Sequence, residues 1–213
     1  LNVTNCTFTG NNARDGGAIW SSRTLNITGS NFVTNTAIRN GGAIWSGSSL
    51  SGVTLNVTGS NFLSNTAITN GGAIHNNAGN AEIHFNRIIG NSPSGNQIRR
   101  SGGNVNIINN WWGDNAGSTG KTSGTVTATT WLVLTITSSQ SWIPTSGTST
   151  ITADLNHLNN GNLATGGSVP NGIPVTFTCT LGSVNPFDAY TINGIATTTF
   201  TGFNSGIATV NAT

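Results

Sequence analysis

The stretch LNVTGSNFLSNTAITNGGAIH, residues 55–75, repeats two earlier stretches of the chain closely. These are LNVTNCTFTGNNARDGGAIW at residues 1–20 and LNITGSNFVTNTAIRNGGAIW at residues 25–45. Two weaker copies, AEIHFNRIIGNSPSGNQI and VNIINNWWGDNAG, begin at residues 81 and 105, so successive copies start 24, 30, 26 and 24 residues apart. Repeats of this length indicate a solenoid, in which each copy forms one coil that packs on the next.

The residue types within the copies favour strands. β-Branched residues, Asn and Gly occur in short alternating runs, without helical periodicity or the Leu content of leucine-rich repeats. We therefore expect an all-β chain that begins with a right-handed parallel β-helix of about five coils over residues 1–120. One asparagine stands at the same place in every copy: Asn11, Asn35, Asn65, Asn91 and Asn115. Because coils stack ~4.8 Å apart, these side chains are predicted to form an internal ladder of amide hydrogen bonds.

The phrase GGAI recurs in the first three copies, although paired glycines weaken a regular strand. We expect it to form a sharp corner, where glycine tolerates a positive φ and the alanine packs against the next coil. Stacking also accounts for the scarcity of charged residues, 6% of the chain, since a column of like charges would repel itself at every coil. The extra residues 46–52 of the second copy are expected to form an outward loop.

The pattern changes in the second half of the chain. Residues 113–130 are rich in Gly, Ser and Thr and are expected to form a linker or capping segment, with the linker itself at 121–130. Residues 131–213 contain alternating strands, such as PVTFTCTLG at 174–182, separated by turn residues, which predicts an immunoglobulin-like β-sandwich. We expect about six strands where such a sandwich has seven. Either residues beyond 213 complete the sheet, so that residues 131–213 lack only its last strand, or the edge is open and accepts a strand from a neighbour.

The composition disfavours several classes of protein. The net charge is +2, with no basic cluster beyond Arg99 and Arg100, so nucleic acid is not an expected partner. No apolar run approaches the ~20 residues of a membrane-spanning helix. Cys6 and Cys179 fall in different predicted domains and are expected to be unpaired thiols. Residue 1 already lies inside a copy, so we expect further coils before it.

The acidic residues do not form the pattern of an active site. The chain contains five of them: Asp15, Glu82, Asp114, Asp154 and Asp188. The first three fall at different positions of the coil, whereas a polysaccharide lyase needs acids on neighbouring coils, so that activity is the least favoured. His75, His84 and His157 have no partner at ligand spacing. We expect no enzyme activity, no metal site and no cofactor.

The residue after each GGAI phrase is aromatic: Trp20, Trp45 and His75. If the preceding isoleucines point inward, alternation places these rings outside as a strip. Such a strip would suit a glycan chain. Alternatively, the rings pack under the loop at 46–52 or against a neighbouring chain.

Five sequons of the type N-x-S/T are candidates for N-glycosylation, at Asn2, Asn5, Asn26, Asn56 and Asn211. Three of them, Asn2, Asn26 and Asn56, recur at one position of the coil. Alternation from the buried apolar residues beside them places these three side chains outside.

The chain resembles the adhesin-like surface proteins of methanogenic archaea. The resemblance rests on the three GGAI copies, on NNWWGDN at 109–115 and on IPVTFTCTLGSVNP with TINGIATTTFTGFNSGIATVNAT between 173 and 213, and it covers most of the chain. In that family, β-helical repeats precede immunoglobulin-like domains related to those of bacterial invasin and intimin. The resemblance implies attachment to cells or surfaces and no catalytic chemistry.

We therefore expect a non-enzymatic extracellular protein of the cell surface, either an adhesin or a filament subunit. Its expected partners are copies of itself or neighbouring modules, joined by strand addition at the sandwich edge. Cell-surface glycans are the expected ligand under the alternative hypothesis, in which Trp20 and Trp45 bind sugars.

Overall fold

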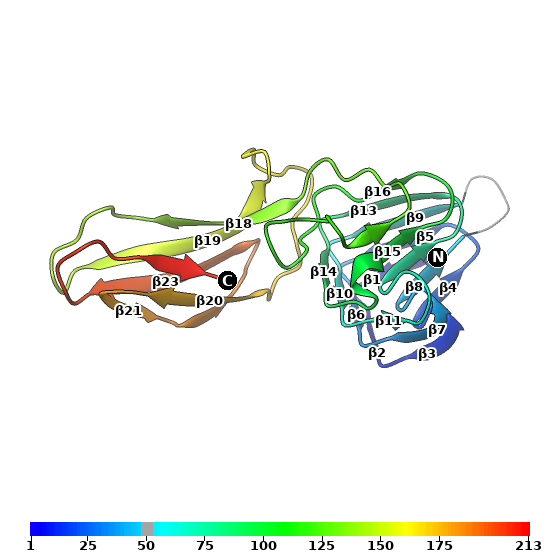
Figure 1. The fold of residues 1–213 in the computed structure, drawn as a ribbon, viewed down its shortest axis with the longest axis horizontal. Coiled ribbons are helices and arrows are strands. Elements are labelled where there is room, and N and C mark those ends of the chain that lie inside the picture. The colour runs from blue at the N-terminus through cyan, green and yellow to red at the C-terminus, as the bar shows by residue number, and fades with distance from the viewer. Residues whose placement is uncertain (48–52) are drawn as a thin grey trace. The chain divides into compact units, whose positions relative to one another are not determined.

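The computed structural model describes residues 1–47 and 53–213, and the chain divides into two compact units (Figure 1). The first comprises Leu1–Leu132 with Ala164–Pro170, and the second comprises Val133–Leu163 with Asn171–Thr213. The first is a parallel β-solenoid, and the second consists of antiparallel sheets consistent with a sandwich, so the expected all-β fold is confirmed. One difference concerns residues 164–170, which the sequence places in the sandwich and the structure places with the solenoid. There Gly167 lies against the ring of Phe85, which a side chain at 167 would meet.

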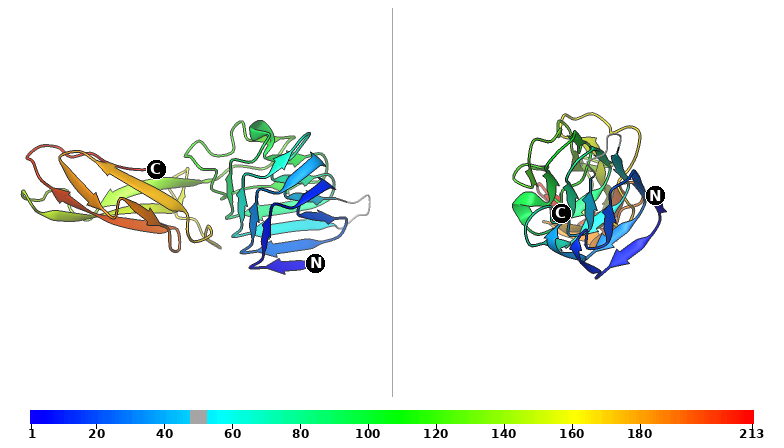
Figure 2. Two further views of the ribbon diagram at one scale, coloured as in Figure 1. Left: turned by 90° about the horizontal axis from the view of Figure 1, so that it is seen from below. Right: turned by 90° about the vertical axis from the view of Figure 1, so that its right-hand side faces the viewer.

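The strands of the solenoid form four parallel sheets, each built from one strand per coil (Figure 2). The first contains β1 (Asn2–Thr4), β5 (Leu25–Thr28), β9 (Thr54–Thr58), β13 (Asn80–His84) and β16 (Val105–Asn106), and the second contains β2 (Thr7–Thr9), β6 (Asn31–Val33), β10 (Asn61–Leu63) and β14 (Arg87–Ile89). The third contains β3 (Asn12–Asp15), β7 (Thr36–Asn40) and β11 (Thr66–Ala67), and the fourth contains β4 (Ile19–Ser21), β8 (Ile44–Ser46), β12 (Ile74–Asn76), β15 (Ile98–Arg100) and β17 (Thr122–Ser123). A short 3₁₀ helix, η1 (Ser94–Asn96), replaces the third strand in the fourth coil.

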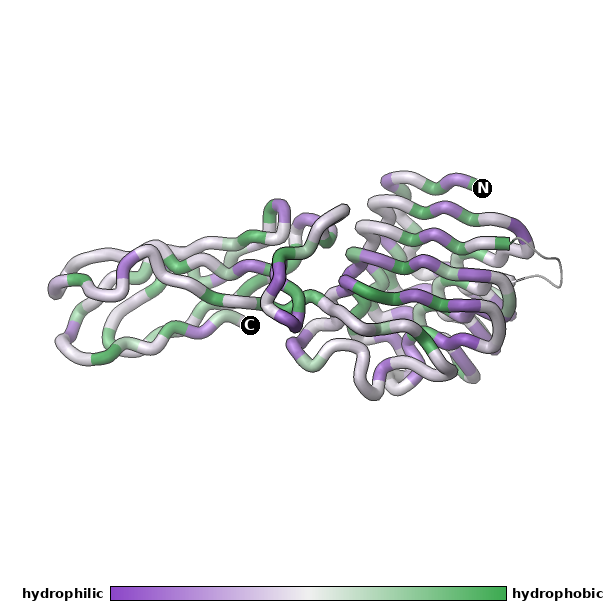
Figure 3. The backbone as a smooth tube through the Cα atoms, turned by 90° about the horizontal axis from the view of Figure 1, so that it is seen from above, coloured by the Kyte–Doolittle hydropathy of each residue, from purple (hydrophilic) through white to green (hydrophobic). Residues whose placement is uncertain are grey.

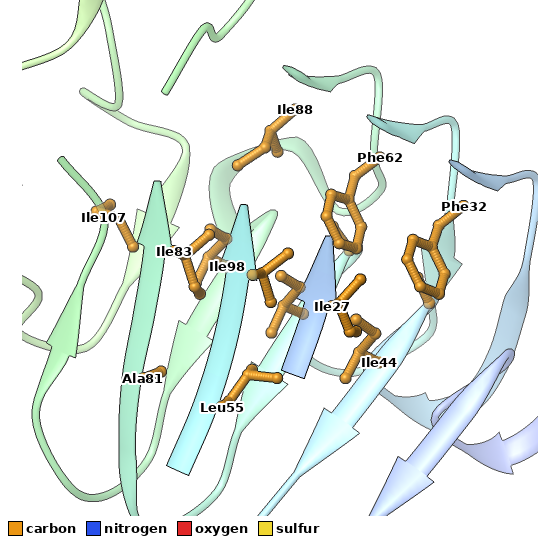
Figure 4. Packing of buried hydrophobic residues seen from close by; sticks show 14 of the residues in the cluster. Ile27, Phe32, Ile44, Leu55, Phe62, Ala81, Ile83, Ile88, Ile98 and Ile107 are labelled. Atoms are coloured by element: carbon orange, nitrogen blue, oxygen red, sulfur yellow. The ribbon is translucent and has the colours of Figure 1, made fainter. Parts of the chain in front are cut away.

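Every strand pairs with its own copy in the next coil, so the coils are in register. Phe32 pairs with Phe8 on one side and Phe62 on the other, and their rings stack with centroids 4.9 Å apart. Figure 4 shows the two rings of Phe32 and Phe62 beside the aliphatic side chains of the same interior. The predicted apolar columns are therefore columns of the core, which continues to the buried Trp112. Along the tube, hydrophobic and hydrophilic bands recur from coil to coil (Figure 3).

The GGAI corner has the geometry that the sequence predicts, with a separate reason for each glycine. The first glycine of each pair has a positive φ, between 64° and 67° at Gly16, Gly41 and Gly71. The second is confined by the next coil, because a Cβ on Gly42 would lie 2.0 Å from the Gly72 carbonyl oxygen. The alanines that follow, Ala43 and Ala73, are fully buried. The first position therefore requires glycine because its φ is positive, and the second requires glycine because a side chain there would clash with the next coil.

The asparagine ladder connects four of the five coils. Asn11 Nδ2 donates to Asn35 Oδ1 at 2.8 Å, and the same bond recurs from Asn35 to Asn65 and from Asn65 to Asn91, both at 2.9 Å. The fifth predicted member, Asn115, is exposed and does not belong to the ladder. Gln97 takes its place and accepts from Asn91 Nδ2 at 3.0 Å. Asn115 lies in the turn-rich segment that follows Trp112, where Gly113 has a φ of 89°, and the coil resumes at β17, which pairs with β15.

A second internal ladder was not apparent from the sequence, because its residue type changes along the column. The backbone N–H of each member donates to the side-chain oxygen of its counterpart in the next coil: Cys6 to Ser30, Ser30 to Ser60, Ser60 to Asn86 and Asn86 to Asn110. Serine hydroxyls and asparagine amides serve equally here, since either offers an oxygen to that N–H. The signal that could have revealed the column is its spacing, which equals that of the first ladder.

The second unit contains seven strands among the described residues. One sheet has the order β18 (Leu132–Ser138), β19 (Thr148–Leu158), β23 (Ile195–Gly202) and β21 (Gly182–Asn185). The other has the order β22 (Asp188–Tyr190), β20 (Pro174–Cys179) and β24 (Val210–Ala212). Ile151, Val175, Phe177 and Phe200 are central to its core. Cys179 is a free thiol, as is Cys6 in the solenoid.

We predict that Asn65→Ala destabilises the solenoid by about 3 kcal/mol or more. The change leaves the backbone N–H and the side-chain amide of Asn35 without their shared acceptor and deprives the Phe32 carbonyl of the Asn65 Nδ2 donor, and each unsatisfied buried group costs about 1–3 kcal/mol. Asn56→Ala is the matched control, because Asn56 also bonds to a neighbouring coil but is exposed; there the loss should be below about 1 kcal/mol. Urea unfolding measures the free energy of unfolding of both variants. An equal decrease in the two variants would contradict the structural role of the internal ladder.

Candidate functional site

The aromatic column lies on the outer side of the fourth sheet. The indoles of Trp20 and Trp45 stack face to face, with centroids 5.1 Å apart and planes inclined by 3°. Trp20 is 56% exposed and Trp45 is half-buried. His75 pairs with Trp45 in the strand register, but it is only 4% exposed and offers almost no surface to a ligand. The structure therefore brings the three residues into one column and exposes chiefly its first member.

Stacking determines which part of these rings a ligand could reach. A sugar packs on the face of an aromatic ring. The Trp20 face toward Trp45 is covered by that ring, and the opposite Trp45 face lies toward the buried His75. The column therefore presents indole edges along its length. This is a smaller platform than the strip of faces that alternation suggested.

His75 is held neutral by its surroundings. Its Nε2 lies 2.8 Å from Ser101 Oγ, and the next residue down the column is Arg99. Burial, reinforced by the Arg99 charge, lowers the pKa of His75 from 6.5 to about 4. The imidazole therefore serves as a neutral hydrogen-bonding group near pH 7.

The acids of the solenoid are engaged individually, in different places. Asp15 accepts from Arg39 at 2.8 Å and from Asn40 at 3.0 Å, and Asp114 pairs with Lys121 at 2.7 Å. Burial alone raises the pKa of Asp15, but the bonds from Arg39 and Asn40 outweigh it, so that pKa lies below its usual value. Glu82 bonds to His84 and to Asn106. These carboxylates stabilise coil-to-coil and loop contacts, and no two of them share a partner.

In the second unit, Asp154 lies 3.4 Å from His157 Nδ1, and Asp188 accepts from the Thr176 hydroxyl. Among the residues that the structure describes, no group of three His, Cys, Asp or Glu side chains is arranged to hold a metal ion. The described part of the chain also contains no helix long and apolar enough to cross a membrane.

The repeated sequons form an external ladder. Asn26 Nδ2 donates to Asn2 Oδ1, and Asn56 Nδ2 donates to Asn26 Oδ1, each at 2.8 Å. The amide nitrogens that would carry glycans at Asn26 and Asn56 are thus already hydrogen-bonded between coils. Asn5 and Asn211 are exposed. Sequence reasoning placed these side chains outside but did not foresee that they pair.

A groove in the second unit is a further candidate site, and its residues were not singled out in the sequence. Its volume is about 660 Å³, and it lies between the end of β18 and the start of β24. Its apolar lining includes Ile136, Ile143, Phe200 and Ile207, and its polar lining is confined to uncharged side chains. Only the predicted open edge of the sandwich pointed toward this region.

Comparisons with known proteins give no match: no family profile, no curated protein and no solved structure is significantly similar to this chain.

We predict that acidification destabilises the solenoid through His75. The unfolded imidazole takes up a proton below about pH 6.5, whereas the folded one does so only near pH 4, so this contribution is complete above pH 6.5 and is lost as the pH falls toward 4. It amounts to about 3 kcal/mol at most, at 1.36 kcal/mol per pH unit. Urea unfolding at pH 7.5 and 4.5 should show a smaller acid-induced loss in His75→Gln than in the unmodified chain. The same loss in both proteins would refute the assignment to His75.

Proposed function

We propose that this chain is a non-enzymatic structural or adhesive protein of the cell surface, an adhesin or a filament subunit that assembles through open β edges. The supporting observation is where the polar side chains of the solenoid direct their hydrogen bonds. Both inside and outside, the asparagines bond to the same residue position of the next coil instead of converging on a common point. Such side chains build a surface of regular shape. A catalytic constellation needs several groups directed at one reacting atom.

Three further observations support the extracellular assignment. The chain resembles adhesin-like surface proteins of methanogenic archaea in its GGAI copies and in its second unit. The exposed sequons at Asn2, Asn5 and Asn211 suit an exported protein. The second unit also has terminal strands in both sheets, which provide backbone groups for joining modules.

The proposal predicts assembly or attachment by the purified chain. Electron microscopy at increasing protein concentration should show rods or fibres, since unpaired strand edges join without a catalytic partner. Binding to isolated archaeal cell envelopes, measured by sedimentation, tests the adhesive form of the same function. Monodisperse monomers at every concentration, together with no binding to envelopes, would contradict the proposal.

Glycan binding is a second candidate, favoured by the exposed indole of Trp20. This side chain is 56% exposed and stacks on Trp45, so the pair offers aromatic surface to a sugar ring.

We expect Trp20→Ala to reduce binding to a glycan array at least ten-fold if this surface binds sugars. Trp142→Ala is the matched control, since Trp142 is also an exposed indole but belongs to the second unit. An array without hits, or equal binding by both variants, would remove glycan recognition by this surface.

A further inference from the structure

The cationic side chains of the protein all belong to the first compact unit. The sequence contains seven Lys and Arg residues, and none falls within Val133–Leu163 or Asn171–Thr213. The first unit therefore has seven cations against three acids, a formal side-chain charge of +4, whereas the second has two acids and no cation, a charge of −2. An anionic partner is therefore attracted to the solenoid and not to the second unit. The seven cations are Arg14, Arg23, Arg39, Arg87, Arg99, Arg100 and Lys121.

Within the solenoid, the charged residues are distributed unevenly over the four sheets. The strands of the first sheet contain one acid, Glu82, and no cation, and those of the second contain one cation, Arg87. The strands of the third and fourth sheets contain four cations and a single acid, which are Arg14, Arg39, Arg99, Arg100 and Asp15. The positive charge of the solenoid is therefore concentrated on one side of the coil.

Three of these arginines lie in or beside the aromatic column. Arg99 belongs to the column, two coils beyond Trp45. Arg14 and Arg39 stand on β3 and β7, just before the GGAI corner that leads into the fourth sheet, and both are exposed. We call this surface the cationic face and define it by Arg14, Arg39, Trp45 and Arg99.

The members of the cationic face are close enough to act on one another electrostatically. Burial and the Arg99 charge lower the pKa of His75, and the Asp15 carboxylate opposes them. Asp15 is also the ion-pair partner of Arg39. The corner before the fourth sheet and the column on that sheet therefore share one electrostatic environment.

Carboxylate partners are scarce on this face. Arg39 has one, since its Nη2 lies 2.8 Å from Asp15 Oδ2. Among the described residues, no carboxylate forms an ion pair with Arg14 or Arg99. Arg99 Nε donates only a long bond of 3.4 Å to Ser101 Oγ. Three guanidinium groups therefore face one carboxylate, and the excess positive charge is open to an external anion.

The rest of the face offers uncharged hydrogen-bonding groups and aromatic edges. In the third coil, Thr69 takes the position of Arg39, and the neighbouring amides of Asn40 and Asn70 are bonded to each other. The indole of Trp45 stacks on that of Trp20 and leaves its edge outward. An acidic polysaccharide matches this set, because its carboxylates suit guanidinium forks, its hydroxyls suit amides and its C–H groups suit indole edges.

The spacing of the arginines disfavours denser anions. Arg14, Arg39 and Arg99 belong to the first, second and fourth coils, so they span about 14 Å along the axis at ~4.8 Å per coil. Duplex DNA presents a phosphate about every 1.7 Å of its axis and binds proteins through clustered cations. Anionic membranes attract clusters of roughly four to eight Lys and Arg residues. A polymer whose charges are separated by sugar rings fits the sparser array.

From these observations we infer that the cationic face of the solenoid binds an acidic polysaccharide, with its carboxylates paired to Arg14 and Arg99. The polymer lies along the coil axis, where it passes the uncharged third coil between the two arginines. The inference rests on the proposed function and deepens its adhesive form, since it names the chemistry of the attached surface and the part of the chain that binds it.

The test uses the full chain and polygalacturonate, a polymer of carboxylated sugars. Its fully methyl-esterified form is the matched control, because the esters remove the charges and keep the sugar backbone. Biolayer interferometry should show at least about ten-fold tighter binding of the acidic polymer, since charge-assisted hydrogen bonds are lost with the ester. Rising salt should weaken that binding, because it screens exposed charges.

Variants of the chain locate the binding. Arg99→Gln should weaken binding of polygalacturonate about ten-fold. Arg100→Gln is the matched control, because it removes the same charge from the next residue, which lies on the other side of the strand and donates from Nε to the Gly103 carbonyl. Asp15→Asn should tighten binding, because it removes the single carboxylate of the face and releases Arg39. Circular dichroism establishes that each variant is folded.

Several results would overturn the inference. These are equal binding of the two polymers, equal losses in Arg99→Gln and Arg100→Gln, or binding that Asp15→Asn leaves unchanged or weakens. Tighter binding of polyuridylate or of phosphatidylglycerol vesicles than of polygalacturonate would make a nucleic acid or a membrane the partner and would also overturn it. If fibres form or envelopes are bound without binding of polygalacturonate, the inference alone fails. If polygalacturonate is bound and the chain neither assembles nor attaches to envelopes, the proposed function alone fails.

Discussion

The solenoid depends on hydrogen bonds that side-chain amides make to the next coil. Each asparagine of the first ladder uses Oδ1 to accept from the backbone and side chain of the preceding coil, as Asn65 does from Asn35. Its Nδ2 donates to the next amide and to a backbone carbonyl, which for Asn65 is that of Phe32. One side chain thereby satisfies polar groups of a buried corner that water does not reach. The corner recurs in the sequence because its hydrogen-bonding requirement recurs in every coil.

The same register explains how the few charged residues are tolerated. Glu82 lies between Asn56 and Asn106 in its column, and Asp15 lies above Asn40. Neither acid therefore faces another charge in its own column. Arg99 lies below His75, and its charge adds to the effect of burial in lowering the pKa of the imidazole. Stacking thus selects neutral amides wherever a column must contain polar side chains.

The sequence predicted the features that repetition specifies and missed those that depend on local departures from it. The register of Phe8, Phe32 and Phe62 followed from spacing alone. Asn115 stands at the expected spacing, but it lies in an exposed turn-rich segment after Trp112, and Gln97 accepts the hydrogen bond from Asn91 in its place.

His75 illustrates a second limit. Alternation predicts the side of a strand on which a side chain lies. It does not predict whether other parts of the chain cover that side, as they do at His75. The packing of Ala164–Pro170 within the solenoid unit is likewise a tertiary contact. A segment rich in turn residues has no sequence pattern that predicts where it packs.

The two units differ in the groups they offer to a partner. Away from its terminal coils, the solenoid pairs its strands along its axis, so its lateral surface offers side chains and no free backbone edge. The second unit has finite sheets, and their terminal strands β18 and β24 border an apolar groove. Backbone pairing can join modules wherever an edge of suitable pattern is available, whereas a surface of asparagines needs a partner of matching spacing.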